Sequence, residues 1–221
     1  MKRLLLPACI AGLLYLQGSF AQSASDSRAG DWEGRLGATF GNSSRVDFDG
    51  GTSADINSTT GLELGLGYHL TDHLELGGNF IYSRPDYDAR IVGSTPDDIW
   101  NANGTLDSSS LIFDATYNFM AGPFTPFVLA GIGWNWTDTN IANCPPEVGC
   151  WWDPWWGYIC TNYQRSKTLD GFAYQLGAGA RYDFNRQFAL SGSYKVNWID
   201  LGNAKGTPDF DGFDLSLRWR F

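Results

Sequence analysis

The chain ends on FDLSLRWRF, residues 213–221, in which every second residue is apolar. A period of two places alternate side chains on opposite faces of a β-strand. One face of this strand carries Phe213, Leu215, Leu217, Trp219 and Phe221, and the other carries Asp214, Ser216, Arg218 and Arg220. A face this uniformly apolar needs either a protein core or lipid to cover it.

The same alternation recurs in seven earlier segments, at residues 31–42, 58–70, 74–84, 108–119, 126–136, 169–184 and 188–198. The connections between them are either tight, at 71–73, 120–125 and 185–187, or long, near 43–57, 85–107, 137–168 and 199–211. Outer-membrane barrels have this asymmetry, because their periplasmic turns are short and their outer loops are long. The sequence therefore predicts an all-β fold, an eight-stranded antiparallel up-and-down transmembrane β-barrel.

A secreted, soluble β-sandwich is the competing interpretation, in which the apolar faces would form a core. The opposite faces are rich in Gly and Ser, which suits a narrow lumen better than a solvated surface. A sheet that spans a bilayer also has to close on itself, because lipid offers no hydrogen bonds to its edges. One alternating segment is weak evidence for a transmembrane strand, but eight in a row are strong evidence, so the pattern favours the barrel.

The composition of the 221-residue chain argues against two classes of protein. Its formal net charge of −9 makes nucleic acid an unsuitable partner. After the leader, no run of apolar residues reaches the roughly 18 that a membrane-spanning helix needs. Residues 1–21 have the charged start, apolar stretch and small-residue end of a secretory signal peptide. We therefore expect a signal peptide at 1–21, a short periplasmic N-terminal segment at 22–30 and the barrel at 31–221.

With its alternating segments and its aromatic ending, the chain resembles the small OmpA/OmpX-type outer-membrane β-barrel family over residues 31–221. In that family the aromatic last strand looks like a signal that the barrel-assembly machinery reads. The resemblance implies a place in the outer membrane of a Gram-negative cell, in contact with outer-membrane lipids and lipopolysaccharide. It implies an assembly-signal role for the apolar face of the last strand, which comprises Phe213, Leu215, Leu217, Trp219 and Phe221.

The inward-facing charged residues are nearly balanced between acids and bases. Eight strands leave an interior just wide enough for side chains, so unpaired charge there would be costly and these groups should pair. We expect an ion-paired plug. The alternative is a narrow ion path gated by those pairs, although a selective pore more often displays one sign of charge. The predicted lumen charge network comprises Glu33, Arg35, Glu63, Glu75, Asp114, Arg181, Asp183, Lys195, Asp214, Arg218 and Arg220.

The sequence predicts no catalytic residue, no metal site and no cofactor. The two histidines, His69 and His73, are four residues apart at a strand and its turn, where that spacing does not build a metal site as it would on a helix. Barrel enzymes that act on lipid A need a histidine constellation near the outer rim. Both histidines are expected at the periplasmic end, so a lipid A-modifying enzyme is the less favoured interpretation.

The segment CPPEVGCWWDPWWGYIC, residues 144–160, crowds aromatic residues into a loop expected outside the membrane. Exposed aromatic clusters often form binding surfaces, although these rings could equally pack on one another and on the barrel rim. The candidate surface for an unknown extracellular ligand comprises Trp151, Trp152, Trp155, Trp156 and Tyr158.

Three cysteines follow the leader in the sequence, so at most one disulfide forms among them. We favour a bond of Cys144 or Cys150 with Cys160, and the candidate pair is Cys150 and Cys160. Taken together, these features predict a monomeric, non-catalytic outer-membrane barrel that serves envelope integrity or surface interaction through its outer loops. The alternative function is a small pore for ions or solutes.

Overall fold

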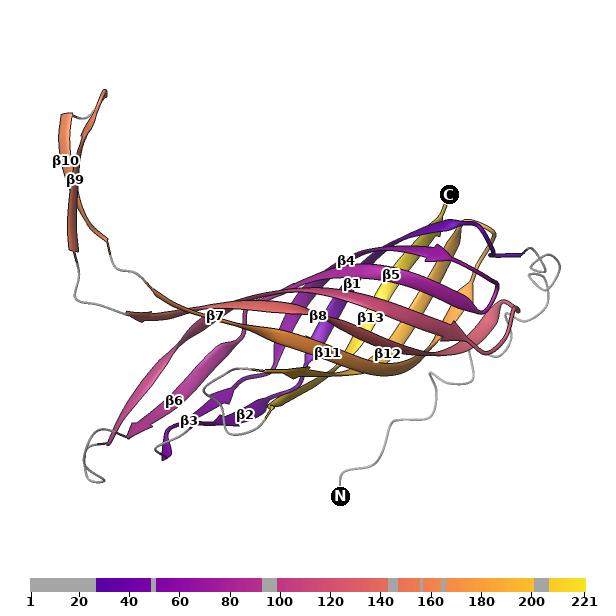
Figure 1. The fold of residues 1–221 in the computed structure, drawn as a ribbon, viewed down its shortest axis with the longest axis horizontal. Helices are drawn as coiled ribbons and strands as arrows, with labels where there is room; N and C mark the ends of the chain where they lie inside the picture. Colours follow the sequence, from indigo (N-terminus) through magenta and orange to yellow (C-terminus); the bar gives the residue numbers. More distant parts are fainter. Residues whose placement is uncertain are drawn as a thin grey trace, which may run out of the picture.

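The structure is a computed structural model, and it describes residues 27–48, 51–92, 99–142, 147–155, 157–163, 166–200 and 207–221. Eight long strands form a closed antiparallel barrel (Figure 1). These strands are β1 (Trp32–Gly41), β4 (Thr59–His69), β5 (Leu74–Ser83), β7 (Ile99–Asn118), β8 (Phe124–Ala142), β11 (Ser166–Asp183), β12 (Phe188–Ile199) and β13 (Asp209–Arg220). The eight-stranded up-and-down barrel expected from the sequence is confirmed.

The barrel closes because each strand pairs with the next and the first strand pairs with the last. The strands run in the order β7-β5-β4-β1-β13-β12-β11-β8, and a further pairing of β7 with β8 completes the ring. At the junction of the two chain ends, Leu36 on β1 lies opposite Leu217 on β13. No sheet edge is left within this ring, as a bilayer requires.

The two faces of each barrel strand differ as the alternation predicts. On β13, Phe213, Leu215 and Leu217 are exposed on the outside, whereas Asp214 and Arg218 are buried inside. Among the described residues, no helix is long and apolar enough to cross a membrane. The exposed apolar girdle is instead presented by the strands, so the lumen is the polar side of the sheet.

The outer ends of the strands differ from the expectation of long loops. Residues expected in loops near 43–57 and 85–107 form β2 (Ser44–Asp47), β3 (Ser53–Ile56), β6 (Asp86–Val92) and the start of β7. They pair in the order β2-β3-β6-β7 and extend one side of the barrel wall (Figure 1). Their alternating segments are short, and their apolar side chains point inward instead of outward. On β6, for example, Tyr87 and Ala89 are buried while Asp86 and Asp88 are exposed.

Two more strands, β9 (Glu147–Asp153) and β10 (Gly157–Tyr163), form a separate two-stranded sheet among the residues that the structure describes. Figure 1 shows this hairpin standing apart from the barrel, at the end opposite the C-terminus. The short turns that follow β4, β7 and β11 all lie at the C-terminal end. The short-turn end is therefore periplasmic and the hairpin end faces outward, as the turn lengths predict.

Candidate functional site in the barrel lumen

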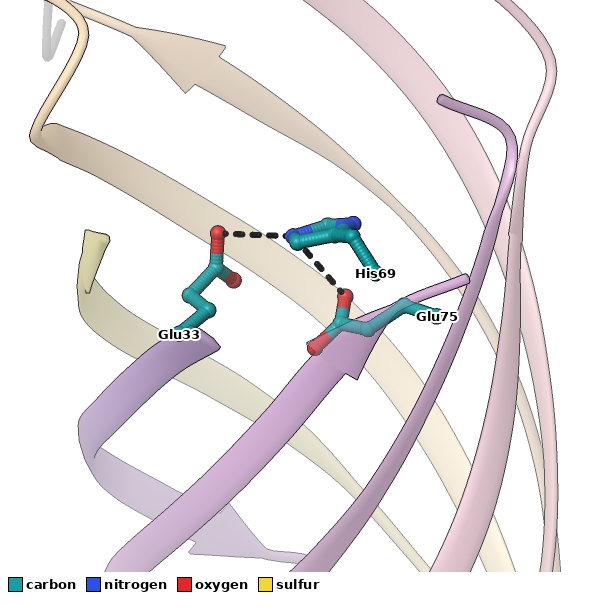
Figure 2. A group of neighbouring side chains, drawn as sticks. All are labelled: Glu33, His69 and Glu75. Carbon is teal, nitrogen blue, oxygen red and sulfur yellow. Dashed lines mark hydrogen bonds and ion pairs between the residues drawn. The ribbon is translucent and has the colours of Figure 1, made fainter. Parts of the chain in front are cut away.

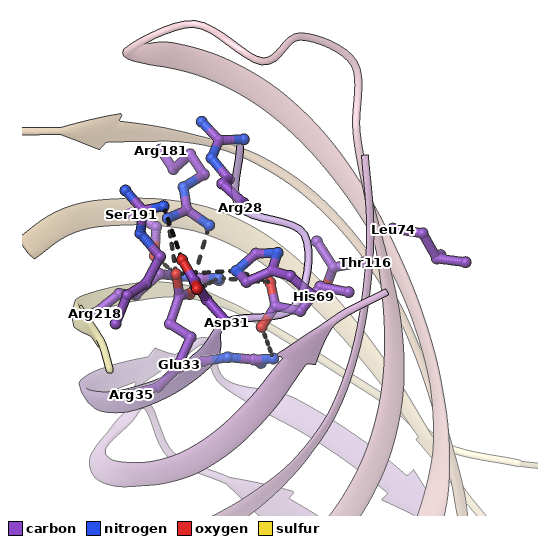
Figure 3. A network of polar contacts seen from close by, with 12 residues as sticks. Arg28, Asp31, Glu33, Arg35, His69, Leu74, Thr116, Arg181, Ser191 and Arg218 are labelled. Carbon is purple, nitrogen blue, oxygen red and sulfur yellow. Dashed lines mark hydrogen bonds and ion pairs between the residues drawn. The ribbon is translucent and has the colours of Figure 1, made fainter. Parts of the chain in front are cut away.

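A network of ion pairs crosses the periplasmic half of the lumen (Figure 3). Arg35 on β1 reaches two neighbouring walls, because its Nη2 lies 2.5 Å from Glu75 Oε1 on β5 and its Nη1 lies 3.4 Å from Asp114 Oδ1 on β7. Asn79 joins the same group: its amide N–H donates to Asp114 Oδ1 at 2.6 Å, and its carbonyl oxygen accepts from Arg35 Nη1 at 3.1 Å. All four side chains are buried.

Two further arginines connect this group to the opposite wall. Arg218 Nη1 on β13 lies 2.9 Å from Glu33 Oε1 on β1 and 3.2 Å from Glu75 Oε2. Arg181 Nη2 on β11 lies 2.8 Å from Glu33 Oε2 and 2.9 Å from Asp183 Oδ1. Contacts therefore run without interruption from β7 through β5, β1 and β13 to β11.

Apolar packing fills the space beside the arginines. Phe127 projects inward from β8 and is buried, and the guanidinium carbon of Arg218 lies 5.4 Å from the centre of its ring. A guanidinium over an aromatic face is an attractive arrangement. On the β8 side, the lumen is thus occupied by an aromatic ring.

A fourth arginine, which the sequence did not single out, comes from the segment before β1. Arg28 enters the periplasmic mouth of the barrel, where its Nη2 lies 2.6 Å from Asp183 Oδ2, 3.1 Å from Thr125 Oγ1 and 2.9 Å from the carbonyl oxygen of Gly122. Its side chain is buried. The segment at 22–30 has no periodic pattern, so nothing in the sequence indicates where its arginine docks.

The turn between β4 and β5 holds this segment in place through Asp72. Its Oδ1 accepts hydrogen bonds from Ser27 Oγ at 2.9 Å and from the backbone N–H groups of Arg28 at 2.6 Å and Ala29 at 3.3 Å. The Ser27 bond first, and then these backbone bonds, lower the pKa of Asp72. The Asp72 carboxylate therefore accepts three hydrogen bonds from residues 27–29, the segment that lies at the periplasmic mouth.

His69 lies between two carboxylates of the network (Figure 2). Its Nε2 is 3.2 Å from Glu33 Oε2 and 4.0 Å from Glu75 Oε2, and one ligand atom from each residue lies within 4.8 Å of the others. An imidazole with two carboxylates is a ligand set that transition metals use. Both carboxylates, however, already contact the guanidinium groups of Arg181 and Arg35, and a metal cation would have to displace them. The arrangement fits an ion-pair network better than a metal centre.

A second, smaller charged group lies farther toward the outer end. Lys195 Nζ on β12 is 2.7 Å from Glu63 Oε2 on β4 and 3.3 Å from Asp214 Oδ2 on β13. All three side chains are buried. Asp214 Oδ2 accepts no hydrogen bond from the described residues. Two carboxyl groups thus share one ammonium group, which donates a hydrogen bond to Glu63 and forms only an ion pair with Asp214.

Above this group the lumen is hollow. A cavity of about 700 Å³ occupies the outer half, with Lys195, Asp214 and Gln175 at its lower end. Its walls are mostly apolar and continue upward along β2, β3, β6 and the start of β7. Sequence reasoning missed the cavity because it treated these strands as loops.

The structure places the predicted lumen charges in three positions. Arg220 lies at the periplasmic rim, where its Nη1 is 3.6 Å from Oδ2 of the half-exposed Asp31. Glu63, Lys195 and Asp214 form the outer group. The remaining predicted charges are buried together in the periplasmic half, and they are Glu33, Arg35, Glu75, Asp114, Arg181, Asp183 and Arg218. His73, outside the network, has its Nδ1 2.7 Å from the carbonyl oxygen of Asn118.

The outer hairpin presents aromatic rings to solvent. Trp152, Trp155 and Tyr158 are 73%, 89% and 68% exposed, and Trp152 lies opposite Tyr158 across the β9–β10 pair. This exposure favours the candidate binding surface over packing on the barrel rim. Trp156 lies outside the described residues, as does the side chain of Trp151.

The register of the same hairpin places Cys150 directly opposite Cys160. Opposed Cα atoms of antiparallel strands lie about 4.5–5.5 Å apart, which is a separation that a disulfide can span. The two side chains, and Cys144, lie outside the described residues, so the disulfide stays a prediction. The assembly-signal role of Phe213, Leu215, Leu217, Trp219 and Phe221 likewise stays a prediction.

The sequence pattern of one known family, described as the outer membrane protein beta-barrel domain, matches residues 11–221. The chain belongs to this family. The outer-membrane barrel is therefore located in the cell outer membrane. No curated protein is similar enough in sequence to count as a relative.

Several solved structures resemble the outer-membrane barrel at low sequence identity. Ail, the attachment invasion locus protein of Yersinia pestis, is 18% identical with a TM-score of 0.49, over 87% of this chain and 99% of that chain. Neisserial surface protein A is 14% identical with a TM-score of 0.49, over 89% and 100% of the two chains. OprG from Pseudomonas aeruginosa is 17% identical with a TM-score of 0.48, over 88% and 97%. Likenesses this distant do not bear on function.

The charges in the periplasmic half of the barrel balance. Four guanidinium groups, those of Arg28, Arg35, Arg181 and Arg218, face four carboxylates, those of Glu33, Glu75, Asp114 and Asp183. Buried ions are tolerated when each is paired and hydrogen-bonded, and this set meets that condition. The periplasmic half of the lumen is therefore occupied by paired charges, while the outer half leaves space for a ligand.

Proposed function

We propose that this barrel is a non-catalytic, non-conducting outer-membrane protein that acts at the cell surface through its outward-facing end. The observation that supports this most is the network of ion pairs in the periplasmic half of the lumen. Arg35, Arg181 and Arg218 link five strands across that lumen, and Arg28 fills the space beneath them. A passing ion would have to break several buried charge-assisted hydrogen bonds at once, and each of these is costly to leave unmade.

The runner-up function is a small pore for ions or solutes. A selective pore generally lines its narrowest part with charges of one sign. Here cationic and anionic groups are mixed in the same part of the lumen and pair with one another, which supports a plug. A pore would need these pairs to separate together in order to open a path.

The outer end of the barrel supports a role in contact with something outside the cell. Exposed Trp and Tyr side chains suit a contact surface, because they bury much area for few rotatable bonds. Trp152, Trp155 and Tyr158 form such a surface on the β9–β10 hairpin. A role confined to envelope integrity would need neither these rings nor the cavity below them.

Planar-bilayer recording of the refolded protein tests this proposal. We expect no steady current from the wild-type protein. The double variant Arg181→Ala/Arg218→Ala, which removes two bridges across the lumen, should show intermittent openings and so prove that the assay detects a path. Arg84→Ala is the matched control, because Arg84 pairs with Asp107 in an exposed position and should leave the barrel silent. Reproducible channels with one ion preference in the wild-type protein would contradict the proposal and support the pore.

The proposal includes no catalysis. His69 sits within the ion-pair network and His73 contacts the backbone of Asn118, so both histidines lie at the periplasmic end. Lipid A lies in the outer leaflet, at the other end of the barrel. Mass analysis of lipid A from cells with and without the protein should give the same species, and a new acylation or deacylation product would contradict this part.

A further inference from the structure

The strand extensions at the outer end turn their apolar side chains inward. On β6, Tyr87, Ala89 and Ile91 line the cavity, while the acidic and basic residues between them are exposed. On β2 and β3, Val46 and Ile56 line the same space. This parity is opposite to that of the membrane-spanning strands below, whose inward side chains are polar. The change of parity shows that the extensions stand in water and enclose an apolar interior.

That interior is hollow, although side chains ordinarily fill an apolar protein interior. Protein cores pack to high density, and voids larger than a water molecule are few. Here about 700 Å³ remain open within a mostly apolar wall. Ligand pockets have volumes of roughly 300–1,000 Å³, mostly apolar walls and a few polar groups that fix orientation. The cavity has the size and lining of a ligand site.

The polar groups at its lower end determine which ligand fits. Lys195 Nζ is shared by Glu63 at 2.7 Å and Asp214 at 3.3 Å, so the group carries two carboxyls against one ammonium. Asp214 lines the cavity, is 4% exposed and contacts Lys195 through Oδ2 as an ion pair without a hydrogen bond. A head group that donates a hydrogen bond suits this end of the cavity, because carboxyl groups outnumber ammonium groups there. An anionic head would instead meet an excess of carboxyl groups, which is unfavourable.

We propose that the outer cavity binds a small apolar molecule that ends in a hydrogen-bond donor and carries no negative charge, such as a straight-chain alcohol. Its apolar chain lies along Ile112, Ala173 and the inward side chains of β6, and its hydroxyl lies at the lower end, beside Asp214. This inference deepens the proposed function, since it names the ligand class taken up at the outward-facing end. The closed lumen below makes the cavity a dead end from which the molecule cannot pass to the periplasm.

Three probes with the same chain and different heads test the assignment: 1-decanol, decylamine and decanoate. Each is titrated into the protein refolded in detergent micelles while side-chain methyl signals are followed by NMR. Ile112 and Ala173 line the cavity and are reporters of binding. Ala189 is as buried as Ala173 but does not line the cavity, so its methyl is the matched control. Leu62 on the lipid-facing surface reports partition of the probe into the micelle.

We expect decanol and decylamine to shift Ile112 and Ala173 saturably, to leave Ala189 unmoved, and to bind at least about tenfold more tightly than decanoate. The isosteric Asp214→Asn variant should reduce that preference to within about threefold. The cavity-filling Ala89→Phe variant should abolish the shifts, and heat-modifiable migration on gels would show that both variants fold.

Two results would overturn the inference. If decanoate binds as tightly as decanol, the assignment of the head group is wrong. If no probe moves Ile112 or Ala173 while Leu62 responds, the cavity is not a site for this class. Neither result affects the closed lumen of the proposed function, which the bilayer recordings decide separately.

Discussion

Individual residues in the periplasmic half of the lumen are stabilised by shared partners. Glu33 accepts from both Arg181 and Arg218, and Asp183 pairs with both Arg181 and Arg28. Removing Arg181 therefore leaves both carboxylates with another guanidinium, but it leaves the group with three guanidiniums against four carboxylates. The resulting loss in the free energy of unfolding depends on how far water is excluded from the network.

The variant Arg181→Ala tests whether water is excluded from the network. Its side chain is fully buried, so we expect a loss of about 3 kcal/mol in the free energy of unfolding, as for breaking buried ion pairs in general. Arg45→Ala is the control, since its pairs with Asp47 and Asp55 are exposed and their loss should cost no more than about 0.5 kcal/mol. Denaturant unfolding in detergent measures both. Equal, small losses would mean that water surrounds Arg181.

Asp72 should make the closing of the periplasmic mouth pH-dependent. Its pKa in the folded state is lowered from the usual 3.8, chiefly by the Ser27 hydroxyl. A lowered pKa means that the carboxylate stabilises the segment fully above pH 3.8, and that this stabilisation is lost as the pH falls through the folded-state pKa. The contribution is thus present from neutral pH down to about pH 4 and absent in stronger acid.

Amide hydrogen exchange at Arg28 and Ala29 measures this effect, because both backbone N–H groups donate to Asp72 Oδ1. Protection factors, corrected for intrinsic rates, should be constant above pH 4 and fall in stronger acid. In Asp72→Asn they should be lower and independent of pH over the same range. Equal protection of these two amides in the wild type and in Asp72→Asn at neutral pH would show that other contacts hold the segment.

At the scale of elements, the barrel depends on close strand contacts where glycine is required. A Cβ added to Gly133 on β8 would lie 1.9 Å from the backbone carbonyl oxygen of Leu111 on the neighbouring β7. The obstacle is backbone in the ladder that closes the ring, so it cannot rotate away as a flexible side chain would. Gly78 on β5 is different, because the nearest atom to its added Cβ lies 3.4 Å away in the ring of Phe113.

We therefore expect Gly133→Ala to impair closure of the barrel and Gly78→Ala to be tolerated. Strand glycines often mark such close approaches. The measure is the fraction of protein that refolds to the heat-modifiable form in detergent micelles, which should fall at least severalfold for Gly133→Ala only. Wild-type refolding of Gly133→Ala would mean that the β7–β8 pairing is looser than the structure has it.

At the scale of the whole molecule, the sequence predicts the barrel wall and much less of its contents. Alternation over eight segments predicts the strands and the inward direction of Glu33 or Arg181, because lipid imposes one pattern on all of them. The partners could not be predicted, since Arg181 and Glu33 are 148 positions apart and Arg218 and Glu33 are 185 apart. Only the barrel closure brings them together.

Two further features escaped prediction for different physical reasons. Arg28 docks from a segment with no periodicity, so its position is fixed by Asp183 and by the turns rather than by a local pattern. The outer cavity depends on strands of four to seven residues, in which the apolar side faces inward instead of outward. Alternation that short is indistinguishable from a loop in a single sequence.

The central claim is that one lumen has a hollow outer half above a filled periplasmic half. Two inward positions on β7 test it directly: Ser110 lines the cavity, and Thr116 is fully buried in the network. Each is replaced by cysteine in a chain whose Cys144, Cys150 and Cys160 are changed to serine, and intact cells are treated with a membrane-impermeant maleimide. Ser110→Cys should react from outside, whereas Thr116→Cys should react only after unfolding. Comparable labelling of both positions in the folded protein would reveal a continuous water path and contradict the account.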